Sequence, residues 1–300
     1  MTGTIEACNL CPRQCGVRRE PEQGEGFCRM GALPVVARAA LHQWEEPSIS
    51  GVRGSGTVFF TGCSLQCVFC QNDSISTRRE VGKVLTPKEL HQVFLRLIDQ
   101  GAHNINLVTP THFALAVAEA LSMEELPVPV VYNCGGYESL ETLRMLEGLV
   151  DIYLPDLKYA SDALGKRYSG APDYFTRASQ AILEMARQTG PARYDEEGMM
   201  QRGTMVRHLI LPGNTRNSIA VLEWLHDNLP EYPVSLMAQY VPCGRASEFP
   251  EINRTITRRE YEKVRDALFR LDLDGYLQGR SAAKKAFIPP FSLEGLEELS

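Results

Sequence analysis

The sequence contains no run of apolar residues that approaches the roughly 18 consecutive positions needed to cross a membrane. Its first residues also lack the pattern of a basic segment followed by an apolar segment that marks a secretory signal peptide. We therefore predict a cytoplasmic protein that has no membrane partner.

Basic side chains are not in excess either. The sequence has 31 Lys and Arg against 37 Asp and Glu, which gives a formal net charge of −6 at pH 7. A nucleic-acid-binding face needs clustered Lys and Arg to neutralise phosphates. We therefore expect no nucleic-acid partner, and a small molecule or a protein as substrate.

Internal repeats and low-complexity segments are also missing. The 300 residues, 44% of them apolar, are typical of a globular protein with one large α/β domain or two ordinary ones. We expect residues 1–50 to form a cysteine-rich segment with a four-cysteine metal site and a linker, residues 51–280 to form a barrel, and residues 281–300 to form a C-terminal tail.

Cysteine is the most informative residue type in this sequence. There are nine cysteines, most of them in closely spaced groups, and without an export signal such spacing favours metal binding over disulfides. The first group, with the spacing C-x2-C-x3-C-x12-C, comprises Cys8, Cys11, Cys15 and Cys28. Four thiolates complete a tetrahedral set, so zinc and a closed iron–sulfur cluster are both reasonable for this group.

The second group, Cys63, Cys67 and Cys70, has the spacing C-x3-C-x2-C and directly follows an apolar run at residues 57–61. Three thiolates are one fewer than a closed metal site needs, whereas a catalytic metal centre keeps one coordination position for a small molecule. Three buried cysteines without metal, or a zinc site completed by a distant ligand, are the alternatives. We predict a catalytic metal centre.

From residue 57 onward, short apolar runs alternate with helical patterns, which is typical of βα units and a parallel sheet. Strands are predicted at residues 57–61, 104–108, 128–132, 150–154, 205–211 and 234–240, and helices at 113–123, 138–147, 173–188 and 218–229. Right-handed crossovers that join six parallel strands produce a partial (β/α)6 barrel. Active residues should then lie at the carboxyl ends of the strands.

Two capping boxes predict where further helices begin. Thr86 and Glu89 flank a Pro at the first helical position, and an apolar stripe follows as far as Gly101. Thr257 and Glu260 have the same spacing and open a last long helix.

Four later stretches carry a specific resemblance: NINLVTPTH at residues 104–112, YNCGGY at 132–137, DIYLPDLK at 151–158 and VRHLILPG at 206–213. Together with the cysteine triad they resemble the radical S-adenosylmethionine (SAM) superfamily. Within it, they resemble the branch of pyruvate formate-lyase activating enzyme-like iron–sulfur proteins. The resemblance runs from about residue 8 to residue 278 and implies a barrel of the radical SAM type.

The resemblance implies a mechanism and its cofactors. Cys63, Cys67 and Cys70 would hold a [4Fe–4S] cluster whose open iron binds the amino and carboxylate groups of SAM. Reductive cleavage of SAM would then yield a 5'-deoxyadenosyl radical that abstracts hydrogen from a substrate. An electron donor such as flavodoxin or ferredoxin would reduce the cluster.

The resemblance also assigns candidate SAM contacts. Phe69 matches an aromatic residue that packs against adenine, and its alternative role is to anchor the loop. Thr109 and Thr111 lie at the turn that binds the amino group of SAM, where Thr-Pro-Thr replaces the common Gly-Gly-Glu. Asn133 stands where activating enzymes carry an Asp, which weakens the case for a bound monovalent cation. Gly135 and the glycine after it would let the backbone approach the cofactor closely.

Charged residues at the expected ends of the fourth and fifth strands complete the candidate SAM site. Asp156 and Lys158 are two apart and point the same way if extended, although a surface ion pair is the alternative. Arg207 and His208 are adjacent, so they face opposite sides of the strand. The resemblance places Arg207 inside the barrel, where its guanidinium would pair with the SAM carboxylate, and leaves His208 a structural role.

Several residues have open roles. Gln239 and Tyr240, where activating enzymes have a histidine, could contact the ribose or the substrate, or belong to packing at the barrel mouth. Cys243 is either a reactive thiol or an ordinary cysteine, and Cys134 is expected in the core. The polar segment at residues 194–202 could cover the mouth or form a solvated hairpin.

We therefore predict a radical SAM enzyme whose substrate is unidentified. One hypothesis is activation of a glycyl radical enzyme, and the other is hydrogen abstraction from a small molecule or a peptide. A non-catalytic iron–sulfur or zinc protein, which transfers electrons or mediates protein contacts, is the alternative.

Overall fold

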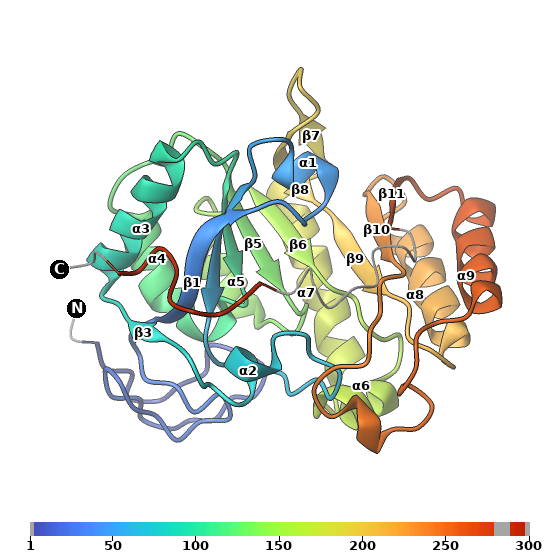
Figure 1. Ribbon diagram of the computed structural model, residues 1–300, viewed down its shortest axis with the longest axis horizontal. Helices are drawn as coiled ribbons and strands as arrows, with labels where there is room; N and C mark the ends of the chain where they lie inside the picture. The colour runs from blue at the N-terminus through green and yellow to red at the C-terminus, as the bar shows by residue number, and fades with distance from the viewer. Residues whose placement is uncertain (1–2, 279–288, 298–300) are drawn as a thin grey trace.

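A computed structural model describes residues 3–278 and 289–297 of the protein. Six strands run parallel in chain order (Figure 1). They are β2 (Ser55–Phe60), β4 (Ile105–Val108), β5 (Val130–Cys134), β6 (Ile152–Pro155), β9 (Val206–Leu209) and β10 (Val234–Met237). The first four lie in one sheet and the last two in a second, and a parallel bridge joins the two sheets. The predicted partial (β/α)6 barrel is confirmed, with strand bounds that shift by up to three residues from those expected.

β6 and β9 are joined by the parallel bridge between Asp156 and Arg207. Before this bridge, β8 (Met200–Thr204) pairs with β6 in the same register. The chain therefore runs from β8 into β9 along one side of β6. The bridge brings two predicted site residues next to each other.

Strands at both edges of the sheet were not predicted. β1 (Val35–His42) pairs antiparallel with β2, and β3 (Lys83–Val84) adds to its other side. At the opposite edge, β11 (Gly275–Gln278) runs parallel to β10. The described C-terminal segment lies along β1, where Arg38 binds Glu294 and the backbone N–H of Leu293 donates to the carbonyl of Ala37 (Figure 1).

The predicted helices are present. They are α3 (Pro87–Asp99), α4 (Ala114–Leu121), α5 (Leu140–Met145), α7 (Tyr174–Thr189), α8 (Thr215–Asn228) and α9 (Arg258–Arg270). Both capping boxes form, because Thr86 and Thr257 each accept a hydrogen bond from the N–H of the glutamate three residues later. Short helices α1 (Pro47–Ser50), α2 (Asp73–Ser76), α6 (Asp162–Ser169), η1 (Thr111–Phe113) and η2 (Ala246–Glu248) were not predicted. None of the helices in the described residues is long and apolar enough to cross a membrane.

Alternation along the strands divides an apolar outer face from a polar interior. Leu107, Tyr132, Tyr153, Val206 and Leu236 pack against the surrounding helices and are fully buried. Because side chains alternate along a strand, their neighbours face the barrel interior. These neighbours include Asn106, Asn133, Arg207 and Ser235.

The amino end of the barrel is closed by apolar side chains. Ile49, from α1, packs against Val131, Ile152, Leu154 and Met205, and it has no exposed surface. We call this cluster the barrel floor. In Figure 1, α1 lies at the end of the sheet opposite α2 and α6, so the barrel floor lies at the end opposite the carboxyl ends of the strands.

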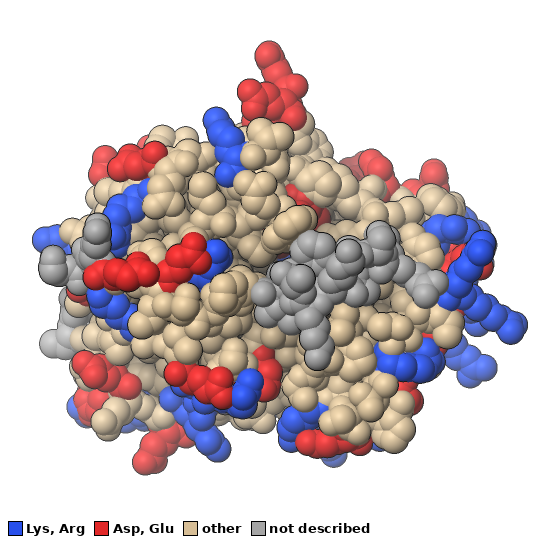
Figure 2. All heavy atoms as spheres, in the orientation of Figure 1, with Lys and Arg blue, Asp and Glu red and all other residues tan. Residues whose placement is uncertain are grey.

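The segment at residues 194–202 forms a hairpin at the same end as the floor. β7 (Arg193–Tyr194) pairs antiparallel with β8, and the turn between them is exposed. The turn precedes β8, which runs parallel to β6, so it lies at the amino end of the sheet and projects away from it (Figures 1 and 2). The solvated hairpin is confirmed, and the segment does not cover the mouth.

Candidate active site

The loop after β2 carries the three cysteines of the triad. The thiols of Cys67 and Cys70 each lie against a serine hydroxyl, at 3.0 Å from Ser169 Oγ and 3.2 Å from Ser76 Oγ respectively. The Leu65 N–H donates to Cys63 Sγ at 3.3 Å. These contacts hold the three sulfur atoms on one loop at the carboxyl end of the sheet.

Burial opposes ionisation of these thiols in the absence of a metal. It raises the pKa of Cys63 far above its usual range and the pKa of Cys70 to about 11, while the nearby Lys158 ammonium lowers both. A metal ion deprotonates a thiol that coordinates it, so the cysteines need the charge of a bound metal to become thiolates. Lys158 follows the end of β6, and its positive charge acts on the thiols of this loop.

A network of charged and amide side chains fills the interior beside the triad. Arg207 lies at its centre: Nε donates to Asp156 Oδ1 at 2.9 Å, Nη1 to Glu45 Oε2 at 3.1 Å and Nη2 to Asn133 Oδ1 at 2.6 Å. Lys158 Nζ binds the other carboxylate oxygen of Asp156. The alternative of a surface ion pair is therefore wrong, because the side chains of Asp156 and Lys158 are each only 17% exposed.

The pKa values of this network follow from the mutual contacts. Burial acts against every charged group in it, yet Arg207 and Lys158 together hold the pKa of Asp156 below its usual value. The same contacts raise the pKa of Lys158 and of Arg207. The two ion pairs of Asp156 therefore stay formed over the physiological pH range, whereas burial raises the pKa of Glu45 despite the nearby charge of Arg207.

Next to this network, several buried polar atoms have no hydrogen-bond partner. Both carboxylate oxygens of Glu46, both amide atoms of Asn106 and the hydroxyl of Ser235 are unpartnered, and each of these side chains is at most 1% exposed. Native proteins leave few buried polar atoms unsatisfied, so a group of them in one interior indicates a place for a ligand. The sequence did not reveal the role of Glu45, Glu46 or Asn106.

The turn after β4 has strained backbone. Thr109 has φ 61°, a left-handed conformation that a β-branched residue adopts at a cost of about 1–3 kcal/mol, and its N–H donates to the Asn133 carbonyl. Thr111 donates its hydroxyl to Glu138 Oε1 at 2.7 Å, so this hydroxyl already has a protein acceptor. Of the two threonines proposed for the SAM amino group, Thr109 is therefore the better placed.

Glu138 is a second buried acid that the sequence did not reveal. It is 2% exposed and accepts hydrogen bonds from Thr111 and from the Tyr132 hydroxyl, yet burial raises its pKa to about 7. A carboxyl with a raised folded pKa favours the folded state at low pH, and this contribution is lost as pH rises from the unfolded pKa of about 4.5 to about 7.

We expect Glu138→Gln to be more stable than the wild type at pH 8 by about 3 kcal/mol, because the variant avoids ionising a buried group. At pH 4.5 the two proteins should unfold at the same free energy. Urea titrations of the metal-free proteins across this range measure the difference. Glu124→Gln, at an exposed position, is the control, and a pH-independent difference for Glu138→Gln would contradict the expectation.

Phe69 and Tyr240 form an edge-to-face aromatic pair, with ring centroids 5.9 Å apart. Tyr240 is 1% exposed and its hydroxyl donates to the Ile252 carbonyl, which favours the packing role over contact with ribose. Gln239 lies against Gln278 and keeps a buried, unpartnered Oε1. Of the two residues at this strand end, Gln239 is thus the one available to a ligand.

His208 and Cys134 have the structural roles that were predicted. His208 is fully buried on the outer side of β9, between the Leu157 carbonyl and the Ser218 hydroxyl, and burial lowers its pKa to about 4. Arg207 faces the opposite side, as strand alternation requires. Cys134 lies in the apolar cluster outside the sheet.

The two glycines after β5 have a packing reason to be glycine. A Cβ on Gly136 would lie 2.4 Å from the Asp156 carbonyl oxygen, and the φ of +77° also disfavours other residues. A Cβ on Gly135 would lie 2.8 Å from Leu65, on the cysteine loop. Close packing between the β5 end and the cysteine loop therefore requires both glycines.

Comparisons with known proteins agree with this geometry. The family model described as Radical SAM superfamily matches residues 57–225. The chain belongs to the radical SAM superfamily. It is also 32% identical over 277 residues to the uncharacterized protein MJ0674 of Methanocaldococcus jannaschii, with 89% of this chain and 75% of that protein covered.

One solved structure agrees with this chain at the level of the fold, and a second is similar over part of it. The chain is similar to SuiB of Streptococcus suis, solved with the precursor peptide SuiA bound, at 16% identity and a TM-score of 0.50. This match covers 73% of the chain and 47% of SuiB, so the chain spans about half the length of that protein. A domain of pyruvate-formate lyase-activating enzyme from Bacteroides vulgatus matches at 16% identity with a TM-score of 0.37, covering 64% of this chain and 91% of that domain.

Radical SAM enzymes typically use a [4Fe–4S] cluster and SAM, and the residues present fit both groups. The triad supplies three sulfur ligands on one buried loop, beside the Lys158 ammonium. Lys158 and Arg207 offer cations to the carboxylate of SAM, and the unpartnered atoms of Asn106 lie on the neighbouring strand. The assignment of individual residues to the cluster and to SAM remains a prediction.

The N-terminal cysteines lie in an irregular segment that docks onto the same end of the barrel. Arg19, 1% exposed, donates to Cys8 Sγ at 3.4 Å and to the His112 carbonyl at 2.7 Å, just after β4. Arg13 donates to the carbonyl of Ser64, within the triad loop, at 2.8 Å. The segment that carries the first cysteine group therefore contacts the loop that carries the second.

Metal binding by the N-terminal group is a prediction. Burial raises the pKa of Cys11 to about 12 and also raises that of Cys28, and the charges of neighbouring cysteines add to both shifts. Within residues 3–278 and 289–297, no group of three or more His, Cys, Asp or Glu side chains has an arrangement that holds a metal ion. Cys243, at the end of the β10 segment, is partly buried.

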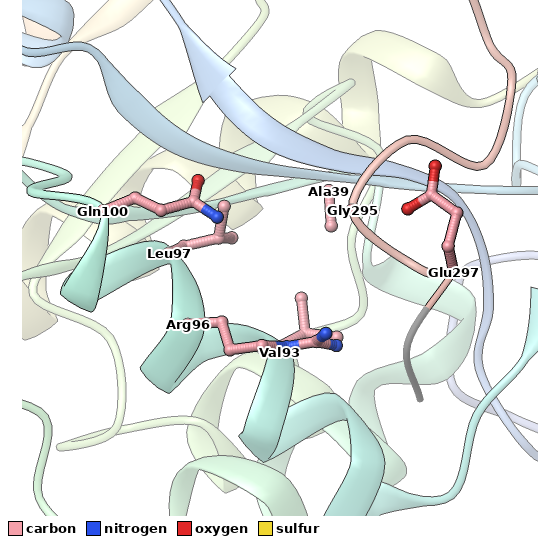
Figure 3. Close-up of a pocket in the computed structure, with 7 residues that line it drawn as sticks. All are labelled: Ala39, Val93, Arg96, Leu97, Gln100, Gly295 and Glu297. Atoms are coloured by element: carbon pink, nitrogen blue, oxygen red, sulfur yellow. The ribbon is translucent and has the colours of Figure 1, made fainter. Parts of the chain in front are cut away.

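A surface pocket of about 340 Å³ lies elsewhere, between α3 and the C-terminal segment (Figure 3). Val93, Arg96 and Glu297 are among the residues that line it. These residues lie outside the sheet, on elements that do not reach the triad. The pocket is therefore separate from the candidate active site.

Proposed function

We propose that Cys63, Cys67 and Cys70 hold a [4Fe–4S] cluster that cleaves SAM reductively, and that the resulting 5'-deoxyadenosyl radical abstracts hydrogen from a substrate in the barrel. One observation supports the proposal most directly. Lys158, just after β6, lies within electrostatic reach of all three cysteines and also binds Asp156, which in turn binds Arg207.

The protein's own residues bind and orient SAM. Lys158 and Arg207 pair with its carboxylate, and Arg207 can present a planar, bidentate donor face. The strained backbone at Thr109 and the amide of Asn133 position the amino group, and Phe69 packs against adenine. The apolar barrel floor keeps bulk water away from the radical.

Three classes of hydrogen donor are candidates for the substrate. SuiB binds a precursor peptide, so a peptide is one candidate hydrogen donor for this chain. A glycyl radical enzyme is another, through the resemblance to activating enzymes, and a small molecule is the third. Reduction of the cluster requires a donor such as flavodoxin or ferredoxin, and a reducing compartment such as the cytoplasm suits the cysteine groups, none of which forms a disulfide.

Anaerobic reconstitution tests the proposal. The protein is loaded with iron and sulfide, reduced with dithionite and supplied with SAM, and 5'-deoxyadenosine is quantified by chromatography. Formation of 5'-deoxyadenosine supports a radical SAM enzyme. If the metal sites are full and SAM stays intact, the chain is instead an electron-transfer or structural metalloprotein.

The N-terminal cysteines make a separate prediction, because the segment has too few large apolar side chains to fold without metal. A Cys8→Ala, Cys11→Ala double variant should lose either one zinc ion or the iron of one cluster, while the triad keeps the iron of its cluster. Elemental analysis after reconstitution measures both metals. Cys134→Ala, in the apolar core, should retain all of the metal, and an unchanged metal content in the double variant would reject the N-terminal site.

A further inference from the structure

Within the described residues, the barrel interior contains one more carboxyl group than basic side chains. Glu45, Glu46 and Asp156 face two cations there, Arg207 and Lys158. Asp156 binds both cations, and Glu45 binds Arg207. In this part of the chain, Glu46 is therefore the carboxyl group without an ion pair.

Glu46 is buried, so the protein leaves its carboxyl group without compensation from water. Its side chain is 1% exposed and neither carboxylate oxygen has a hydrogen-bond partner. The charge of Arg207 reaches it, but Arg207 donates its three hydrogen bonds to Asp156, Glu45 and Asn133 and none to Glu46. A buried carboxylate without a partner is unfavourable unless it is protonated or a cation binds it.

Two other unpartnered side chains adjoin the two glutamates. Asn106 on β4 interacts with Glu45, and Ser235 on β10 interacts with Glu46, although no hydrogen bond of standard geometry forms. Neither Asn106 nor Ser235 has any exposed surface. The carboxyl, amide and hydroxyl oxygens of Glu46, Asn106 and Ser235 therefore form a buried set of acceptors beside the two glutamates. Burial raises the pKa of Glu46, and a cation bound to it would oppose that effect.

We propose that Glu46, Asn106 and Ser235 form a recognition site for a cationic group, a primary ammonium or a guanidinium, on the substrate that donates hydrogen. The inference rests on the proposed function, because it places this site next to the residues assigned to SAM. It narrows the substrate class to molecules or peptides that carry such a group, for example a lysine or arginine side chain.

The chemistry of the site favours a cation over a neutral ligand. An ammonium group has three donors and a guanidinium five, so either can satisfy several of the unpartnered oxygens at once. With its amino group bound to iron, SAM would bring a sulfonium and a carboxylate whose charges cancel, so it would not neutralise Glu46. Its carboxylate would share Arg207 and Lys158 with Glu45 and Asp156.

A calorimetric titration tests the site without relying on turnover. Methylguanidinium is titrated into the reconstituted holoenzyme with SAM bound, and methylurea serves as a neutral probe of the same shape. We expect methylguanidinium to bind the wild type at least about ten-fold more tightly than methylurea does, since one charge-assisted contact is worth a factor of that order. Glu46→Gln should lose this preference, and Glu124→Gln, on the exposed surface, should keep it.

Ser235→Ala provides a second variant that changes little volume, and it should weaken methylguanidinium binding by about two- to five-fold. Equal binding of the two probes to the wild type, or an undiminished preference in Glu46→Gln, would overturn the inference. Full competition of potassium ion with methylguanidinium would also overturn the inference, because the site would then hold an inorganic ion. Failure of the wild type to cleave SAM would reject the proposed function instead, and is measured separately.

Discussion

A Cys67→Ala variant is expected to form no 5'-deoxyadenosine after anaerobic reconstitution, whereas the wild type forms it. The loss should be complete, because two thiolates and no replacement ligand do not hold a cube with one open iron. Cys67 is the middle cysteine of the loop, with its thiol 3.0 Å from the Ser169 hydroxyl. The iron content of the variant should fall by about four atoms per chain relative to the wild type.

The matched control is Cys134→Ala, which removes a buried cysteine that lies outside the sheet in an apolar cluster. This variant should keep both its iron and its SAM cleavage, apart from a small loss of stability. Electron paramagnetic resonance of the reduced proteins distinguishes a missing cluster from an inactive one. Full SAM cleavage by Cys67→Ala would mean that the triad does not bind the catalytic cluster.

Arg207→Met is expected to produce the second large effect, a loss of about 3–5 kcal/mol in the free energy of unfolding. The substitution leaves Glu45 and Asp156 buried without the guanidinium that joins them, and breaking a buried ion pair from one side has a cost of this size. Denaturant titration of the metal-free protein measures the loss. Arg258→Met, at a side chain that is 83% exposed, should change stability little.

A double variant separates the structural role of Arg207 from its role toward SAM. Adding Glu45→Gln to Arg207→Met removes one of the two carboxylates that lost the guanidinium, so about half of the lost free energy of unfolding should return. SAM binding, measured by equilibrium dialysis with the reconstituted protein, should stay weak in both variants. Recovery of SAM affinity together with stability would show that Arg207 acts only by holding the barrel together.

The fold was largely predictable because short segments of the sequence determine most of its strands and helices. Each of the six parallel strands is a short apolar run, and the capping boxes at Thr86 and Thr257 specify where two helices begin. β1 was missed because its sequence, VVARAALH, is rich in alanine, which has little preference for strands. It forms because long-range pairing with β2 and β3 and contact with the C-terminal segment bury it.

The candidate site was only partly predictable. Alternation correctly separated Arg207 from His208, since the two sides of a strand are set by the chain itself. Glu45 and Glu46 precede a proline that opens α1, and an acidic pair before a helix is usually solvated, so local sequence gave no reason to place them inside. Asn106, a polar residue within the apolar strand INLV, was a usable signal that the interior is polar.

Because the barrel floor around Ile49 packs apolar side chains across the amino end, we expect ligands to enter from the carboxyl ends of the strands. If SAM binds beside the triad, a substrate that reaches Glu46 has to pass through the space that SAM leaves open. Product release would then be ordered: 5'-deoxyadenosine would have to leave before the product formed from the substrate at Glu46.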